Sequence, residues 1–310
     1  MLQGSEMTDR IAELATRLRD GGLVAFPTET VYGLGADATN SDAVLSIYET
    51  KGRPRFNPLI VHCADLAMAE TLVAFSPVAR RLAEAFWPGP LTLVLPRRED
   101  GGLSDLVTAG LETVGVRVPD HALALALIRA AGRPLAGPSA NPSGRLSPTT
   151  AEQVIAGFAG KVPVLDGGAC VAGVESTILK IDGDVVTQLR AGALAREEVE
   201  ALLGRPVAVA APNAEIASPG MLASHYAPDA LMRLDAEAPR AGEAYLGFGD
   251  TGGDLNLSPS GDLREAARNL FAMLHALDAT GAPRIAVAPI PSQGLGEAIN
   301  DRLSRAAAPR

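Results

Sequence analysis

Apolar residues follow two alternating patterns along the first two thirds of the chain. Ile11, Leu14 and Leu18 recur at helical spacing, which predicts a helix that the pair Gly21-Gly22 ends. The next run, residues 23–26, is wholly apolar and stops at Pro27, as a short buried strand does. Because segments of these two kinds alternate over residues 1–205, we predict a mixed α/β domain there.

Other elements of this domain follow from the same two patterns. Strands are predicted at residues 59–62, 91–95, 114–118, 134–137, 162–166, 176–181 and 185–189. One helix is predicted with Ser41 as its N-cap, and another is predicted to begin at Ser76-Pro77. Further helices are predicted over residues 122–131, 150–158 and 196–203.

The pattern changes after residue 205. Residues 206–230 are rich in alanine, valine and proline and have neither period, so we interpret them as a linker. Beyond it, a helix with Leu263, Leu270 and Leu277 on one face separates apolar strands at 244–248 and 285–289, and a last helix is predicted near 295–307. This order predicts a smaller α/β domain over residues 231–310.

Composition narrows the class of protein. Of 310 residues, 47% are apolar and 20% charged, a balance typical of a folded chain. The net charge is −9, and both halves are acidic, with 19 basic against 24 acidic residues before Pro206 and 8 against 12 from there on. Since a nonspecific nucleic-acid binder normally carries a positive surface, direct nucleic-acid binding is not expected.

Location is predicted from what the sequence lacks. It has no run of 18 apolar residues, so we expect no membrane span. The N-terminal residues do not resemble a secretory signal, and two cysteines are too few for a disulfide framework. We therefore expect a cytoplasmic protein with reduced thiols.

Several common functional motifs are not supported. The sequence contains no P-loop, no serine-hydrolase elbow and no zinc-ligand spacing. Residues 247–252 match G-x-G-x-x-G after a strand, but the following helix begins only near Asp262, too late for a dinucleotide fingerprint. We interpret this segment as a turn.

One loop carries an unusual concentration of positive charge. Lys51, Arg53 and Arg55 lie within five residues, among glycine and prolines that disfavour a helix or a central strand. Lys51 is one of only three lysines in the chain. A rigid loop that presents lysine and arginine is suited to binding a polyphosphate. The alternative is a solvated basic loop.

Two further loops and three side chains have the chemistry of a binding site. Residues 27–35 and 138–150 follow predicted strands and offer hydroxyl, amide and backbone groups, although a plain turn or an N-cap at Ser147 or Thr149 would also explain them. Arg117 and Arg190 lie in or after apolar strands, so each must pair with a structural carboxylate or face a pocket. His62 ends a strand, where a structural role is more common.

Together these segments resemble a known family. The chain resembles the YrdC-like threonylcarbamoyl-AMP synthases in their long two-domain form. The resemblance is carried by residues 26–35, 51–59, 87–92, 116–119, 138–144, 173–178 and 190–192, and for the long form by 218–228 and 288–305. It implies a YrdC-like domain with a twisted mixed sheet and helices, followed by a smaller Rossmann-like α/β domain.

The resemblance also implies an activity. Such a nucleotidyltransferase converts L-threonine, bicarbonate and ATP into threonylcarbamoyl-AMP and pyrophosphate, with Mg²⁺ expected on the phosphates. A separate transferase would use the product for threonylcarbamoyladenosine modification of tRNA. Two alternatives stay open: an RNA-binding module, and an enzyme that forms a carbamoyl-adenylate with another acceptor.

Functional residues are implied position by position. The expected threonine ligands are Thr30, His62, Arg117, Gly137 and Ser176. The expected ATP ligands are Lys51, Arg53, Asn57, Thr113, Ser139, Asn141, Ser147, Arg190 and Tyr226. Lys51 and Arg53 are expected to act in catalysis, and Tyr226 of the linker to close over the nucleotide.

Overall fold

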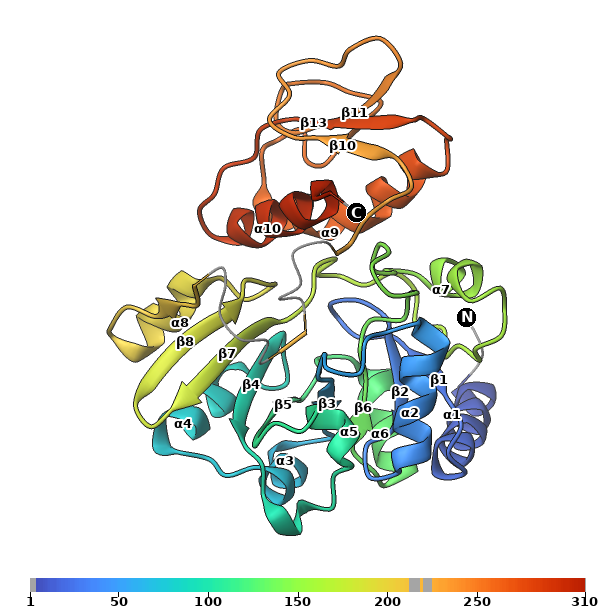
Figure 1. The fold of residues 1–310 in the computed structure, drawn as a ribbon, viewed down its shortest axis with the longest axis vertical. Coiled ribbons are helices and arrows are strands. Elements are labelled where there is room, and N and C mark those ends of the chain that lie inside the picture. The colour runs from blue at the N-terminus through green and yellow to red at the C-terminus, as the bar shows by residue number, and fades with distance from the viewer. Residues whose placement is uncertain (1–3, 212–217, 220–224, 310) are drawn as a thin grey trace.

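The protein is described here by a computed structural model that covers residues 4–211, 218–219 and 225–309. Two α/β bodies lie one above the other in Figure 1, and the C-terminal one is the smaller. No helix in these described ranges is both long and apolar enough to cross a membrane. The architecture confirms the predicted fold class.

The larger body is built on a mixed sheet of nine strands. Their order across the sheet is β1 (Val24–Phe26), β2 (Gly33–Asp37), β6 (Leu135–Ala136), β3 (Ile60–His62), β5 (Thr113–Arg117), β4 (Leu91–Pro96), β7 (Thr177–Asp182), β8 (Val185–Arg190) and β9 (Ala208–Val209). The pairs β3–β5, β4–β7 and β8–β9 are parallel, and the other neighbours are antiparallel. β9 extends the sheet into the segment predicted as linker.

Helices surround this sheet. They are α1 (Gly4–Arg19), α2 (Ser41–Lys51), α3 (Leu66–Leu72), α4 (Pro77–Phe86), α5 (Asp105–Thr108), α6 (Ala122–Ala131), α7 (Ala151–Gly157) and α8 (Arg196–Leu203), with a short 3₁₀ turn, η1 (Glu99–Gly101). The start of α4 is as predicted, because the Ser76 side chain accepts a hydrogen bond from the Ala79 amide and proline follows it.

The smaller body has a fully parallel sheet. Its strands lie in the order β10 (Leu231–Arg233), β13 (Arg284–Val287), β11 (Glu243–Gly247) and β12 (Leu255–Asn256). Figure 1 shows α9 (Leu263–Asp278) and α10 (Leu295–Ala307) between this sheet and the larger body. The two helices therefore form the surface that the second domain presents to the first.

Three local predictions are corrected. Residues 162–166 do not form a strand, because Pro163 lacks an amide hydrogen and the segment pairs with β1 only at the bridge Ala25–Val164. Asn40, rather than Ser41, caps α2 and accepts hydrogen bonds from the amides of Asp42 and Ala43. The cap of α7 is Thr150 in a capping box, rather than Ser147 or Thr149.

Strand β2 was not predicted, because its sequence, Gly-Leu-Gly-Ala-Asp, lacks the usual strand composition. Its glycines have a packing role. A Cβ on Gly33 or Gly35 would press on the ring of Phe26 in the neighbouring strand β1. The short strands β10 and β12 were also not predicted.

One apolar cluster crosses from the first body to the second. Val31, Leu146 and Val174 of the first domain pack with the buried residues of α9, α10 and the small sheet. Gly173 permits this contact, because it has a φ of 73° and an added Cβ would overlap the backbone of Ala267 and Arg268 in α9. The second domain is therefore closely packed on the first.

Candidate active site

A cavity lies where the ends of several first-domain strands meet the linker. It is lined by Thr28, Thr30, Val31, Gly33, Arg53, Ile60, His62, Arg117, Gly137, Pro138, Ser139, Glu175, Ser176, Arg190, Pro219, His225 and Tyr226. These residues come from loops and strand ends that are far apart in the sequence. The sheet order brings them together, because β6 lies between β2 and β3, and β5 and β4 follow.

The basic loop forms one wall of this cavity. Gly52 adopts the left-handed conformation that ends α2, and the chain then turns so that Arg53 lines the cavity. Arg53 donates hydrogen bonds to the carbonyl oxygens of Asn57 and Pro58, at 3.2 and 2.9 Å. Burial lowers the pKa of Arg53 to about 10, so the side chain stays charged at neutral pH. Arg53 is buried, so it does not belong to a solvated basic loop, which was the alternative prediction. Arg55 of the same loop is exposed to solvent.

Lys51 ties this loop to the loop after β6. Its Nζ donates a hydrogen bond of 2.6 Å to the carbonyl oxygen of Ser139 and another to that of Asn141. Lys51 is buried, and burial together with the nearby Arg53 holds its pKa well below the usual value. An anion beside this side chain would favour its charged form.

The expected ATP residues fall into two groups. Arg53, Ser139, Arg190 and Tyr226 line the cavity. The cavity wall does not include the other expected ATP ligands, which are Lys51, Asn57, Thr113, Asn141 and Ser147. Asn141 donates its amide to the carbonyl oxygens of Pro142 and Arg145, which shapes the loop. Thr113 begins β5, at the opposite end of that strand from Arg117.

Arg117 anchors the expected threonine group. Its Nη1 donates to Thr30 Oγ1 at 3.0 Å, its Nε donates to the Gly89 carbonyl at 3.2 Å, and its Nη2 lies 2.7 Å from Glu29 Oε2. Both Arg117 and Glu29 are buried. Of the two options that the sequence left open, both hold: Arg117 pairs with a structural carboxylate and also lines the cavity.

His62 faces the same side of the cavity. Its Nδ1 is buried without a hydrogen-bond partner among the described residues, and a Cβ on Gly137 would lie 2.9 Å from that nitrogen. Burial, and then the charge of Arg117, lower the pKa of His62 to about 3. The imidazole is therefore neutral at physiological pH and has a free ring nitrogen for a ligand.

Ser176 connects the two halves of the site. Its hydroxyl lies 2.8 Å from that of Thr92. Arg190 donates to the Ser176 carbonyl at 2.8 Å and to its hydroxyl at 3.2 Å. Gly192 makes this approach possible, because an added Cβ would overlap the backbone of residues 175–177.

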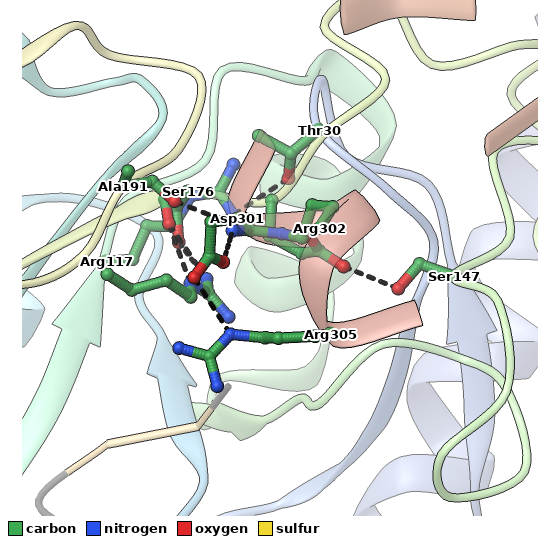
Figure 2. Close-up of polar contacts among 10 residues, drawn as sticks. Thr30, Arg117, Ser147, Ser176, Ala191, Asp301, Arg302 and Arg305 are labelled. Carbon is green, nitrogen blue, oxygen red and sulfur yellow. Dashed lines mark hydrogen bonds and ion pairs between the residues drawn. The ribbon is translucent and has the colours of Figure 1, made fainter. Parts of the chain in front are cut away.

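A further set of contacts was not expected from the sequence (Figure 2). Ser147 Oγ donates to Glu175 Oε1 at 2.5 Å, and Arg302 of α10 donates to Glu175 Oε2 at 2.7 Å. Tyr226 is buried with a φ of 61°, and its ring lies 5.1 Å from the Arg302 guanidinium carbon. Glu175 and Arg302 fall inside segments that carry the family resemblance, but no local pattern distinguishes them. Within the described part of the chain, no three His, Cys, Asp or Glu side chains are grouped as a metal site.

Two family models match successive parts of the chain. A family model described as "Telomere recombination", for Sua5, YciO and YrdC proteins, matches residues 16–192. A second, described as "Threonylcarbamoyl-AMP synthase, C-terminal domain", matches residues 194–308.

Relatives are similar over almost the full length. The threonylcarbamoyl-AMP synthase of Bacillus subtilis is 42% identical, over 97% of this chain and 94% of its own. That of Schizosaccharomyces pombe is 36% identical, over 98% and 89%. A crystal structure of Pyrococcus abyssi Sua5 complexed with L-threonine superposes with a TM-score of 0.89 at 40% identity, over 97% of this chain and 94% of the other. The chain therefore belongs to the threonylcarbamoyl-AMP synthase family, in its long form with two domains.

Proposed function

We propose that this chain joins L-threonine, bicarbonate and ATP into threonylcarbamoyl-AMP and releases pyrophosphate. The names of its full-length relatives support this activity. The structural observation that carries the proposal is a cavity in which Arg53 and Arg190 face Arg117 and Thr30. A nucleotide and an amino acid can be held side by side in such a site.

The phosphate half is defined by positive charge. Arg53 and Arg190 are buried cations on the cavity wall, and Lys51 lies behind the loop that carries Ser139. Burying several cations together is unfavourable without a counter-ion, and a triphosphate supplies one. We propose that these side chains and the Ser139 hydroxyl hold the phosphates of ATP.

The amino-acid half is defined by Arg117. A guanidinium at the cavity wall is suited to the carboxylate of an amino acid. Thr30, Ser176 and the free Nδ1 of His62 add hydrogen-bonding groups around it. The similar Sua5 of Pyrococcus abyssi was crystallised in complex with L-threonine, and we propose the same amino acid for this chain.

The reaction needs placement more than a protein nucleophile. The threonine nitrogen bonds to the carbon of bicarbonate with loss of water, and a carbamate oxygen then attacks the α-phosphorus while its bond to the pyrophosphate oxygen breaks. Positioning and neutralisation of charge dominate such phosphoryl-type transfer. We propose that Mg²⁺ accompanies ATP, since Mg²⁺ commonly binds through substrate phosphates and water. Tyr226, buried at the cavity wall, would exclude water from the carbamate and the acyl-adenylate.

We propose that the product passes to a separate transferase for tRNA threonylcarbamoylation and that the protein acts in the cytoplasm. Two other functions predict different behaviour. An enzyme for another acceptor would release pyrophosphate with an amine other than threonine. An RNA-binding module would bind RNA with steep salt dependence and turn over no ATP.

Pyrophosphate release tests the proposal when each substrate is omitted in turn. We expect release only when threonine, bicarbonate and ATP are all present. Arg53→Ala should lower the rate at least about 100-fold, the usual loss for a buried group that stabilises transition-state charge. Arg55→Ala is the matched control, because Arg55 is exposed in the same loop, and it should stay within a few fold of the wild type. Unchanged turnover in Arg53→Ala would contradict the phosphate role.

A further inference from the structure

An arginine of the second domain reaches the wall of the cavity. Arg302 lies on α10, and its side chain has no exposed surface. Its Nε donates to Glu175 Oε2 at 2.7 Å, its Nη1 to Asp301 at 2.6 Å and its Nη2 to the Ala191 carbonyl at 2.9 Å. Figure 2 shows Arg302 beside Asp301 of the same helix and close to Ala191 and Ser147 of the first domain. A long charged side chain is rarely buried this completely unless each of its groups has a partner.

Glu175 is the reason that a cation is needed at this point. Among the described residues that line the cavity, it is the only carboxylate. It lies near Arg190 and shares the cavity wall with Arg53, where the phosphates of ATP are proposed to bind. An uncompensated carboxylate in this buried setting would repel a triphosphate strongly, because the local dielectric is low. Arg302 supplies a positive charge in direct contact with it, and the Ser147 hydroxyl satisfies its other oxygen. Asp301, the second carboxylate that Arg302 contacts, is itself paired with Arg305.

The charges favour a fixed ion pair. Burial alone would raise the pKa of Glu175, but Arg302 and Arg190 outweigh it and hold the pKa below the usual value. Burial also opposes the charge of Arg302, yet Tyr226, Glu175 and Asp301 raise its pKa above the ordinary value. The pair is therefore ionised, and its net charge is close to zero.

Arg302 also supports the linker tyrosine. Its guanidinium carbon lies 5.1 Å from the centre of the Tyr226 ring, a cation–π distance. Phe271 of α9 packs against the same ring at 5.6 Å, and His225 meets it edge-on at 4.0 Å. Tyr226 has a φ of 61°, which is unfavourable for a residue with a Cβ. Contacts from the second domain therefore hold this side chain in place.

From these contacts we propose that Arg302 is a positioning residue of the adenylating site: it neutralises Glu175 and fixes Tyr226, so that ATP binds only when the second domain is docked. This inference rests on the proposed function. It gives the second domain a specific role, which is to supply a charge that the first domain lacks. Arg302 contacts Glu175 and Tyr226, which line the cavity, and acts on the substrate through them.

A double-mutant cycle separates this role from simple packing. The variants are Arg302→Met, Glu175→Gln and the pair together, with Arg264→Met, an exposed arginine of α9, as matched control. ATP and threonine affinities are measured by calorimetry, and kcat and KM by pyrophosphate release. We expect Arg302→Met to weaken ATP binding at least tenfold and to change threonine binding less than twofold. Glu175→Gln should restore most of that loss in the double variant, because no carboxylate remains to repel the phosphates. The control should match the wild type.

Conservative replacement adds a second readout. Arg302→Lys keeps the charge but loses the planar contacts to Ala191 and Tyr226, so it should retain ATP affinity better than Arg302→Met. If Arg302→Met does not fold, Arg302→Lys and Glu175→Gln still test the charge: the first should weaken ATP binding less than threefold and the second should leave it unchanged or tighter.

Two results would overturn the inference. One is unchanged ATP binding in Arg302→Met or, if that variant does not fold, weaker binding in Glu175→Gln. The other is a loss that Glu175→Gln fails to relieve, which is the behaviour of a packing residue. Failure of the proposed function is recognised separately, because the wild type would then release no threonine-dependent pyrophosphate, whereas the cycle is measured on ATP binding.

Discussion

Buried neutral histidines should make this protein lose stability between pH 7.5 and 5.5. His62 and His225 are almost fully buried, and burial is the largest cause that lowers the pKa of each to about 3. Arg117 adds to the effect for His62, while for His225 the cations Arg53 and Lys51 add and Glu175 opposes. In the unfolded chain both side chains have a pKa of about 6.5.

The direction and the size of this stability change follow from the linkage between proton binding and folding. Because the folded pKa is lowered, the unfolded state takes up protons first, so this contribution is complete above pH 6.5 and is lost as the pH falls toward 3. Each of the two histidines lowers the free energy of unfolding by about 1.4 kcal/mol for each pH unit below 6.5. At pH 5.5 the two histidines together should lower the free energy of unfolding by about 3 kcal/mol. Burial also lowers the pKa values of His121 and His275, which adds in the same direction.

Urea unfolding at the two pH values measures this effect. Trp87, the single tryptophan of the chain, lies in the first domain and reports its unfolding by fluorescence. The wild type should lose about 3 kcal/mol or more between pH 7.5 and 5.5. His62→Gln should lose about 1.4 kcal/mol less over the same interval, whatever its stability at pH 7.5. Equal losses in the two proteins, or no loss in the wild type, would refute the reasoning.

Two further predictions concern contacts that the structure identified. Gly173→Ala should undock the second domain and weaken ATP binding at least tenfold, because the added Cβ overlaps the backbone of α9. Gly183→Ala is the control, since Gly183 also has a positive φ but has open space around it. Equal radii of gyration for the two variants, measured by small-angle scattering, would contradict the predicted undocking. Glu29→Gln should lower the free energy of unfolding by about 3–5 kcal/mol, because it leaves Arg117 buried beside a neutral group; a thermal unfolding midpoint equal to that of the wild type would show that the pair is not needed.

Much of the fold could be predicted from the sequence, because the local spacing of apolar residues indicates which face of a helix or strand is buried. Helices α1, α6, α9 and α10 and most central strands could be predicted from the spacing of apolar residues, and glycine marks the ends of α1 and α6. Where local rules conflict with packing, the prediction was wrong or missing. Residues 162–165 are apolar but include Pro163, and β2 is glycine-rich because Phe26 lies against it.

The sequence by itself also made the Lys51 loop a candidate for binding a polyphosphate, since the charge and stiffness of this loop are local properties. Only the tertiary structure decided their partners. Arg117 pairs with Glu29, Lys51 with carbonyl groups about ninety residues later, and Glu175 with Arg302 of the other domain. Such pairs depend on the order of strands in the sheet and on how two domains pack. A local sequence pattern carries no information about either, because the energy of a buried charge depends on what surrounds it in space.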